Sequence, residues 1–182
     1  MPEDPITTYV VLLRGVNVGG EHRLSMAAFV ELLTALGAQA PRTFIQSGNA
    51  VFSGETRADW APQIQAGLRE RCGLDVPAVV LTAAELRDLV DSDPLRAQGL
   101  AEEALSIGFL GAAPPDEAVH ALDPERSPGD RFAVVGRAVY LFCPRGVART
   151  KLTNAWFDRQ LRTVSTFRNL RTVAALVEMA EE

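Results

Sequence analysis

The amino-acid sequence predicts an α+β fold of two tandem ferredoxin-like units, each a β-α-β-β-α-β unit with an antiparallel sheet and helices packed on one face. Two observations lead to this prediction. Short apolar strands alternate with segments of helical period along the whole chain. A β-hairpin signal flanked by helical segments occurs once in each half. With 182 residues, of which 47% are hydrophobic, the chain can bury a core without disulfides or metal.

The first half of the chain supplies the elements of the first unit. Ser25 is a suitable N-cap for the first helix, and Gly37 is placed to end it. The sequence Ser47-Gly48-Asn49 is a hairpin signal between two strands, and Gly73 follows the second helix, which Asp59 can cap. The expected ranges, in chain order, are strand 8–13, helix 25–37, hairpin 43–52, helix 59–73 and strand 76–81.

The second half repeats this order after a connecting helix. The residues Thr82 and Glu85 form a capping box that opens the connecting helix, and Pro94 ends it. A second hairpin turns at Gly136-Arg137. The expected ranges are strand 105–110, a helix starting at 114–117, hairpin 131–142, a helix containing 152–161, strand 164–167 and a last helix containing 170–177.

The two halves are similar enough to favour an internal duplication. Segments 44–52 and 132–140 share aromatic ends, a central glycine and an Ala-Val pair. The predicted domains are therefore residues 1–82 as the first unit, 83–104 as a connecting helix and linker, and 105–182 as the second unit with an extra C-terminal helix.

The charge balance argues against a general nucleic-acid-binding protein. The chain has 18 basic and 23 acidic residues, a net charge of −5, whereas such proteins are normally basic. Nucleic acid is an unlikely partner that the sequence does not exclude, because a local basic pocket remains compatible with this charge. Lys151 is the single lysine of the chain, which favours a site that needs a compact ammonium there, with chance as the alternative.

Neither the cysteines nor the histidines indicate a metal or redox site. Cys72 and Cys143 lie outside any CxxC pattern and are expected as buried thiols, and His22 and His120 are isolated. We expect no metal and no cofactor. The acidic N-terminus lacks a basic region, and Arg14 interrupts the first apolar run too early for a signal peptide or a membrane span. We therefore expect a cytoplasmic protein without a membrane partner, and its oligomeric state stays open.

Two long motifs resemble a bacterial family, domain of unknown function 1697. They are the segments Leu12–Gly20 and Ile45–Phe52, and the resemblance extends over nearly the whole chain, including Lys151–Thr153 and Thr166–Asn169. The chain departs from the family pattern directly afterwards, with leucine at position 170 in place of tryptophan and arginine at 171 in place of asparagine. The resemblance implies tandem ferredoxin-like α/β units and brings no established activity or cofactor.

The loop after the first strand is one candidate ligand site. It has GxxxxG spacing, but Glu21 and His22 stand where a phosphate-binding P-loop needs lysine and serine or threonine. Strands one and two of a β-α-β-β-α-β unit run in the same direction, so their ends lie at one edge of the sheet. Guanidinium, amide and hydroxyl groups there suit an anionic or hydrogen-bonding ligand. The expected ligand contacts are Arg14, Asn17, Arg23, Gln46, Ser47 and Asn49. The alternative is a flexible connection whose glycines only supply positive φ.

A second cluster is expected at the opposite edge, in the second half. Its members precede two helices and follow strands that end on the same side: Arg149, Lys151, Arg168 and Asn169. Helix N-termini there add positive potential and free N–H groups. The alternative is ordinary helix capping by Thr150 or Thr153 and by Asn169, with solvated arginines nearby.

The motifs leave the catalytic residues unknown. Ser47 lacks a GxSxG elbow, the acidic residues show no catalytic spacing, and no RNA-binding aromatic motif is present. The leading interpretation is an uncharacterised cytoplasmic protein that binds a small anionic or phosphorylated ligand. One alternative is an enzyme that acts on such a ligand through Arg or Lys electrostatic stabilisation. The other is a non-catalytic protein-interaction or oligomerisation module.

Overall fold

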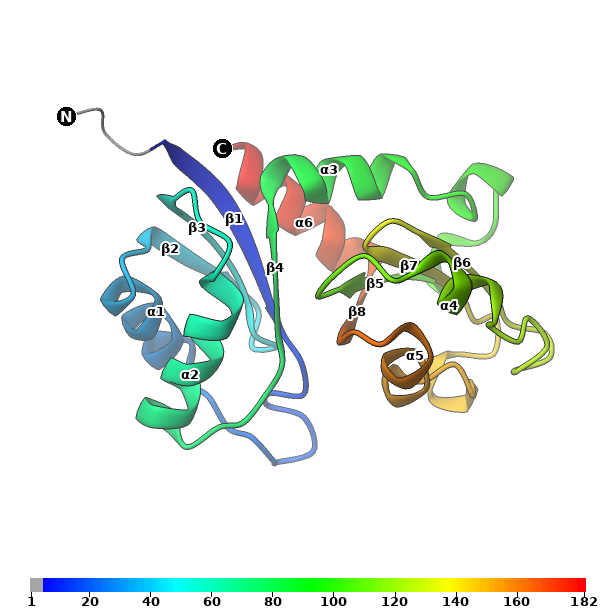
Figure 1. Ribbon diagram of the computed structural model, residues 1–182, viewed down its shortest axis with the longest axis horizontal. Coiled ribbons are helices and arrows are strands. Elements are labelled where there is room, and N and C mark those ends of the chain that lie inside the picture. Colours follow the sequence, from blue (N-terminus) through cyan, green and yellow to red (C-terminus); the bar gives the residue numbers. More distant parts are fainter. Residues whose placement is uncertain (1–4) are drawn as a thin grey trace. The chain divides into compact units, whose positions relative to one another are not determined.

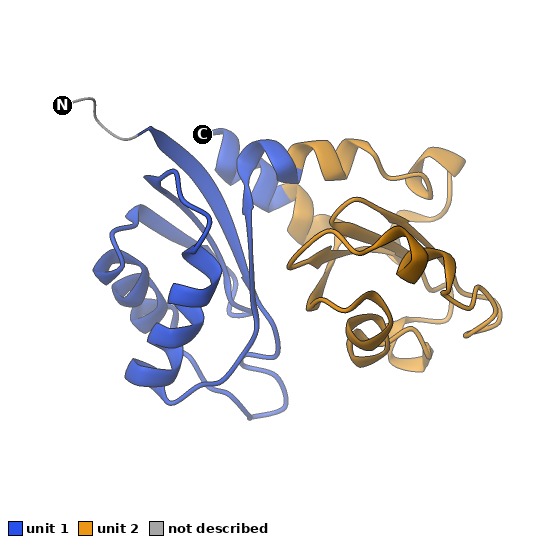
Figure 2. Cartoon of the chain, viewed as in Figure 1, with its two compact units in different colours: residues 1–86, 175–182 blue, residues 87–174 orange. Residues whose placement is uncertain are grey.

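The computed structural model describes residues 5–182, which form two four-stranded antiparallel sheets with helices (Figure 1). The predicted α+β class is confirmed. The chain divides into two compact units, one comprising Met1–Leu86 and Ala175–Glu182 and the other Arg87–Ala174 (Figure 2). The C-terminal segment therefore belongs to the same unit as the N-terminal half.

The first sheet has the strand order β2-β3-β1-β4, and its central strand β1 is antiparallel to both neighbours. The Ser25 side chain accepts a hydrogen bond from Ala28 N (3.1 Å) at the start of the first helix, and Gly73, at φ +65°, ends the second. The elements are β1 (Ile6–Leu13), α1 (Met26–Ala35), β2 (Gln39–Phe44), β3 (Asn49–Glu55), α2 (Trp60–Cys72) and β4 (Ala78–Thr82).

The second sheet has the corresponding strand order β6-β7-β5-β8, with β5 antiparallel to both β7 and β8. The elements of this half are α3 (Ala83–Asp91), η1 (Arg96–Gln98), η2 (Glu102–Ala104), β5 (Leu105–Leu110), α4 (Asp116–His120), β6 (Arg131–Val135), β7 (Ala138–Phe142), η3 (Val147–Arg149), α5 (Asn154–Leu161), β8 (Ser165–Asn169) and α6 (Leu170–Glu181). The predicted capping box is present at the start of α3, because Glu85 N donates to Thr82 Oγ1 (3.1 Å) and Thr82 N donates to Glu85 Oε2 (2.8 Å).

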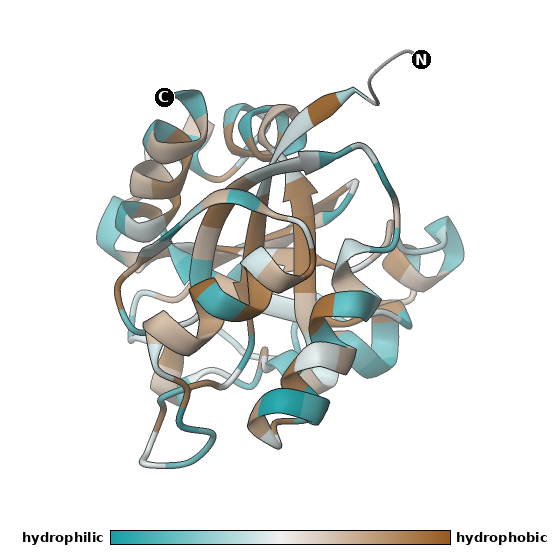
Figure 3. Cartoon of the chain, turned by 90° about the vertical axis from the view of Figure 1, so that its left-hand side faces the viewer, coloured by the Kyte–Doolittle hydropathy of each residue, from teal (hydrophilic) through white to brown (hydrophobic). Residues whose placement is uncertain are grey.

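Each unit has its own apolar core between its sheet and its helices. In the first unit, Tyr9, Phe52 and Trp60 form an aromatic cluster beside Phe29 of α1. In the second, Phe157 of α5 packs in a cluster with Trp156 and with strand residues of β7. The strands are largely hydrophobic and the helices are of mixed hydropathy (Figure 3), as expected of amphipathic helices on a buried sheet.

The helices inside the predicted β-α-β-β-α-β units pack against one face of each sheet, whereas the connecting helix α3 and the last helix α6 contact the other face. In the second unit Val139 and Leu141 face α5, so Tyr140 points to the opposite face, where its hydroxyl donates to Leu89 O of α3 (2.5 Å). In the first unit Arg42 of β2 forms an ion pair with Glu182 and donates to Met179 O at the end of α6 (2.6 Å). Helical periodicity identifies α3 and α6, but it does not encode the sheet face that each helix covers.

The beginning of β2 also differs from the prediction. The strand begins at Gln39, four residues before the expected start, and its register shifts between Gln39 and Arg42. Ala40 has φ +47° and Pro41 follows it, which is an irregularity that a simple alternation pattern does not reveal. Within the described part of the chain, no helix is long and apolar enough to cross a bilayer.

Candidate functional site

The structure brings together the two segments of the first predicted cluster. Leu13 N donates to Gly48 O (2.9 Å), which joins the end of β1 to the turn between β2 and β3. Asn17 Nδ2 donates to Gln46 O (2.6 Å) across the same edge. The topological argument therefore places the loop and the turn correctly.

Asn17 holds the loop in shape. Its Oδ1 accepts from Leu24 N (2.9 Å) and its Nδ2 donates to Leu24 O (2.8 Å) and to Gln46 O. The residue has φ +56°, a left-handed conformation that asparagine tolerates better than most residues. Since both polar atoms of the side chain bind backbone groups, the position of Asn17 is explained by loop structure alone.

Ser47 and Asn49 have a similar role in the neighbouring turn. Asn49 is fully buried, and its Nδ2 donates to Phe44 O (3.2 Å) and Ser47 Oγ (3.1 Å). The exposed residues Arg23 and Gln46 line an open depression with Asn17, whereas Arg14 is absent from its lining. The first predicted cluster is thus mainly a set of loop-stabilising contacts beside a shallow surface depression.

Two residues of the second predicted cluster, Arg168 and Asn169, are among those that line a larger cavity of about 590 Å³ in the second unit. Strands β7 and β8 are both antiparallel to β5, so they end at the same sheet edge, and the cavity opens there under the loop before α5. We call it the Ser106 cavity. Its lining residues are Glu103, Ala104, Leu105, Ser106, Leu141, Cys143, Gly146, Val147, Thr150, Leu152, Thr153, Asn154, Phe167, Arg168 and Asn169.

Ser106 is the most informative polar group in this cavity. It is only 7% exposed, and it pairs in register with Leu141 and Asn169, two other lining residues. Among residues 5–182 its hydroxyl has no hydrogen-bond partner. The oxygen is not among the fully buried unpartnered atoms of the described residues, so it is accessible from the cavity, where a water or a ligand can bind it.

The beginnings of two helices also line the Ser106 cavity. Thr153 caps α5, because its Oγ1 accepts from Trp156 N (3.2 Å), and Asn169 caps α6, because its Oδ1 accepts from Thr172 N (2.8 Å). The capping roles that the sequence offered as an alternative are therefore present. Both helix starts contribute positive potential to the cavity, since their first N–H groups have no partner within the helix.

The guanidinium of Arg168 lies on the other face of the sheet. Arg168 and Tyr140 both pair with Ile107, whereas Phe167 and Leu141 belong to the neighbouring positions that face α5. Arg168 Nη1 donates to Thr166 Oγ1 (2.7 Å) and to Phe167 O (3.0 Å), and burial lowers the pKa of Arg168 to about 10. The guanidinium remains charged at neutral pH.

Arg149 and Lys151 are exposed and are not among the residues that line the cavity. The backbone N of Lys151 donates to Ser127 Oγ (3.2 Å), which holds the backbone in place, and the Lys151 side chain lies outside the cavity lining. The structure therefore does not bring the lysine ammonium to the guanidinium of Arg168. Sequence spacing places these residues at one edge of the sheet but does not determine the face toward which each side chain points.

Sequence analysis missed Ser106 and Glu103 as candidate site residues. The signal for Ser106 was a polar residue in the otherwise apolar strand 105–110, at a position whose neighbours face a core. Cys143 also lines the cavity, and burial raises the pKa of its thiol, so the thiol is neutral at pH 7. Within residues 5–182 no group of three metal-binding side chains occurs.

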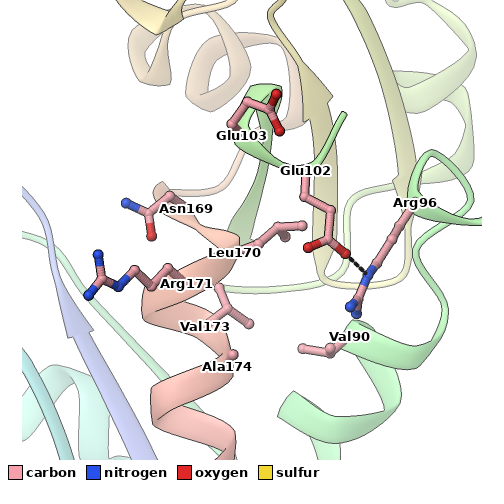
Figure 4. A pocket seen from close by; sticks show the side chains of 9 residues that line it. All are labelled: Val90, Arg96, Glu102, Glu103, Asn169, Leu170, Arg171, Val173 and Ala174. Atoms are coloured by element: carbon pink, nitrogen blue, oxygen red, sulfur yellow. Dashed lines mark hydrogen bonds and ion pairs between the residues drawn. The ribbon is translucent and has the colours of Figure 1, made fainter. Parts of the chain in front are cut away.

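A second cavity of about 420 Å³ adjoins the first, and Glu103 and Asn169 line both (Figure 4). Its apolar lining comes from α3 and α6, through Val90 and Val173 among others. At its edge Arg96 Nε and Glu102 Oε1 form an ion pair of 3.0 Å. Glu103 lies apart from this pair in Figure 4, and it forms no ion pair with any residue that the structure describes.

Comparison with known proteins gives a family and a structural neighbour. A family model described as "Protein of unknown function (DUF1697)" matches residues 6–140. The conserved bacterial protein SP0830 from Streptococcus pneumoniae has a similar structure, with a TM-score of 0.74 and 20% sequence identity over 97% of this chain and 99% of that chain. At this identity the likeness concerns the fold alone. No curated protein matches the chain.

Proposed function

Because the chain belongs to the DUF1697 family of proteins of unknown function, we propose a function from the site itself: the protein binds a small anionic ligand in the Ser106 cavity. Phosphorylated small molecules are included in this class. The observation that carries the proposal is the Ser106 hydroxyl, 7% exposed, at the lining of the cavity and without a partner among the described residues. A ligand oxygen would accept a hydrogen bond from this hydroxyl.

Further donors support an anionic group at this position. The N-terminal ends of α5 and α6 meet the cavity at Thr153 and Asn169, and each offers N–H groups and positive potential. Asn169 uses its Oδ1 for capping, which leaves the Nδ2 group as an additional donor. Hydrogen bonds to a charged acceptor are stronger than those between neutral groups.

The remaining lining is apolar and suits an organic molecule. Leu141, Leu152 and Phe167 supply aliphatic and aromatic surface, and the volume of about 590 Å³ lies within the usual range for small-molecule sites. Small-molecule pockets commonly combine apolar walls with a few polar groups that fix orientation. Burial raises the pKa of the Cys143 thiol in the lining, so this cysteine is not an activated nucleophile at neutral pH.

A thermal-shift screen of organic acids, sugar phosphates and nucleotides tests this proposal. We expect at least one anion to raise the melting temperature, and Ser106→Ala to weaken its binding about tenfold, as the loss of a hydrogen bond to a charged group implies. The free Ser106→Ala protein should be as stable as the wild type, since the hydroxyl has no partner to lose.

Ser92→Ala is the matched control. Ser92 is exposed, lies in the same unit and does not line the cavity, and its hydroxyl donates to Asp88 O (2.7 Å). This variant should bind the same anion as tightly as the wild type does. Equal weakening in both variants, or the absence of any binding anion, would contradict a ligand site at Ser106.

We also propose that both units are ferredoxin-like and arose by duplication. The two sheets have corresponding strand orders, β2-β3-β1-β4 and β6-β7-β5-β8, which support this relationship. A cytoplasmic location is likewise a proposal. It is supported by two free cysteines, which are typical of proteins from reducing compartments.

A further inference from the structure

We infer that the ligand of the Ser106 cavity is zwitterionic: an organic anion that also carries an ammonium group, with an apolar body between the walls of the cavity. This inference rests on the proposed function and names its ligand class. It follows from the two ends of the site, which offer a carboxylate at Glu103 and hydrogen-bond donors at Ser106 and the helix starts.

Glu103 supplies the negative end. Glu103 is an exposed residue that lines both neighbouring cavities, and its carboxylate has no ion-pair partner among the described residues. The adjacent Glu102 forms an ion pair with Arg96 (Oε1 to Nε, 3.0 Å), and Figure 4 shows the Glu103 side chain apart from that pair. A ligand in the Ser106 cavity therefore has the Glu103 side chain as a neighbour.

The positive end has no lysine or arginine head group from the α5 side of the sheet. The guanidinium of Arg168 bonds to Thr166 Oγ1 and lies on the opposite face, and Lys151 is outside the lining. Neutral donors remain: the Ser106 hydroxyl and the helix starts at Thr153 and Asn169. Such donors bind one carboxylate well, whereas a multiply charged anion would also be repelled by Glu103.

The spacing of the two ends fits a small molecule. Glu103 and Ser106 are three residues apart, so their Cα atoms are separated by at most about 11 Å. Leu141 and Phe167 border the space beside Ser106 and offer surface to an aliphatic or aromatic group. A carboxylate, an ammonium and an apolar side chain on one small molecule satisfy all three parts of the site.

Three probes with the same aromatic body separate the contributions. They are L-phenylalanine, 3-phenylpropionate, which lacks the ammonium, and phenethylamine, which lacks the carboxylate. In isothermal titration with the full chain, we expect L-phenylalanine to bind about threefold to fivefold more tightly than 3-phenylpropionate, as expected for one partly exposed ion pair. Phenethylamine should bind more weakly than L-phenylalanine, because Ser106 and the helix starts lose their acceptor.

Two substitutions assign these differences to residues. Glu103→Gln should remove the preference for L-phenylalanine over 3-phenylpropionate and leave 3-phenylpropionate binding equal or slightly tighter. Ser106→Ala should weaken L-phenylalanine and 3-phenylpropionate alike. Glu125→Gln is the matched control for charge, because Glu125 is exposed, in the same unit and outside the lining. It should preserve the preference.

The outcomes distinguish this inference from the proposed function. One outcome is that 3-phenylpropionate or another anion binds through Ser106, but the ammonium gives no tighter binding or the tighter binding is kept in Glu103→Gln. The inference of a zwitterionic ligand is then wrong, and the proposal of an anion site at Ser106 remains supported. If no probe and no anion of the screen binds, both are wrong. The expected pattern, a preference lost only in Glu103→Gln, supports both.

Discussion

Replacing Asn17 by alanine should destabilise the first unit strongly, although Asn17 is a half-buried loop residue. The substitution removes three hydrogen bonds from the side chain to Leu24 N, Leu24 O and Gln46 O. For a half-buried residue these contribute about 2 kcal/mol together. The left-handed φ of +56° costs alanine about 1 kcal/mol more. We expect a loss of about 3 kcal/mol in the free energy of unfolding.

Urea unfolding followed by tryptophan emission measures this loss. Each unit contains one buried tryptophan, Trp60 in the first and Trp156 in the second, so a Trp156→Phe background reports on the first unit alone. Asn17→Gly separates the two contributions, because glycine tolerates the conformation and loses only the hydrogen bonds. It should be about 1 kcal/mol more stable than Asn17→Ala. A loss below about 0.5 kcal/mol in Asn17→Ala would refute the structural role of this side chain.

Three further predictions concern glycine, tyrosine and cysteine positions. Gly48→Ala should lower the free energy of unfolding by about 3 kcal/mol and Gly15→Ala by only about 1 kcal/mol in the same urea assay. Both glycines have positive φ, but only a Cβ at Gly48 would lie 2.7 Å from Leu13 Cβ and Val16 Cγ2. Equal losses in the two variants would contradict the clash. Burial and Asp93 raise the pKa of Tyr140 to about 12, so the folded protein keeps the phenol protonated while the unfolded chain ionises from about pH 10. The free energy of unfolding should therefore fall between about pH 10 and pH 12 more steeply in the wild type than in Tyr140→Phe. Parallel pH profiles of the two proteins would contradict this prediction. In the folded protein a thiol reagent should modify the half-buried Cys72 before the buried Cys143, as mass spectrometry of the partly reacted protein would show. The reverse order would contradict the burial of the Cys143 thiol.

Short-range features of the fold were predictable because their partners are close in sequence. Ser25 bonds to Ala28, and Thr82 bonds to Glu85, each three residues away, so the local sequence pattern alone identifies the helix starts. The left-handed end of α2 at Gly73 follows from the same local logic. The adjacency of the β1 loop and the β2–β3 turn also followed, because strand direction is determined by the order of elements.

The role of side chains at the site was less predictable. The bond from Asn17 to Gln46 O joins residues 29 positions apart, and no local pattern distinguishes it from a ligand contact. Arg168 and Phe167 are neighbours in sequence but face opposite sides of the sheet, which strand alternation predicts only once the register is known. The single lysine favoured a site at Lys151, whereas the structure points to Ser106, a neutral residue whose significance depends on its place in the lining of a cavity.

The division of the chain has a consequence for the order in which it folds during synthesis. Residues 175–182 belong to the unit formed by the N-terminal half, and Arg42 of β2 bonds to Met179 O within it. These residues leave the ribosome after all of residues 87–174. The unit whose strands are synthesised first can therefore be completed only last, and deletion of the final helical turns should weaken the N-terminal half of the protein, not the half that precedes them in sequence.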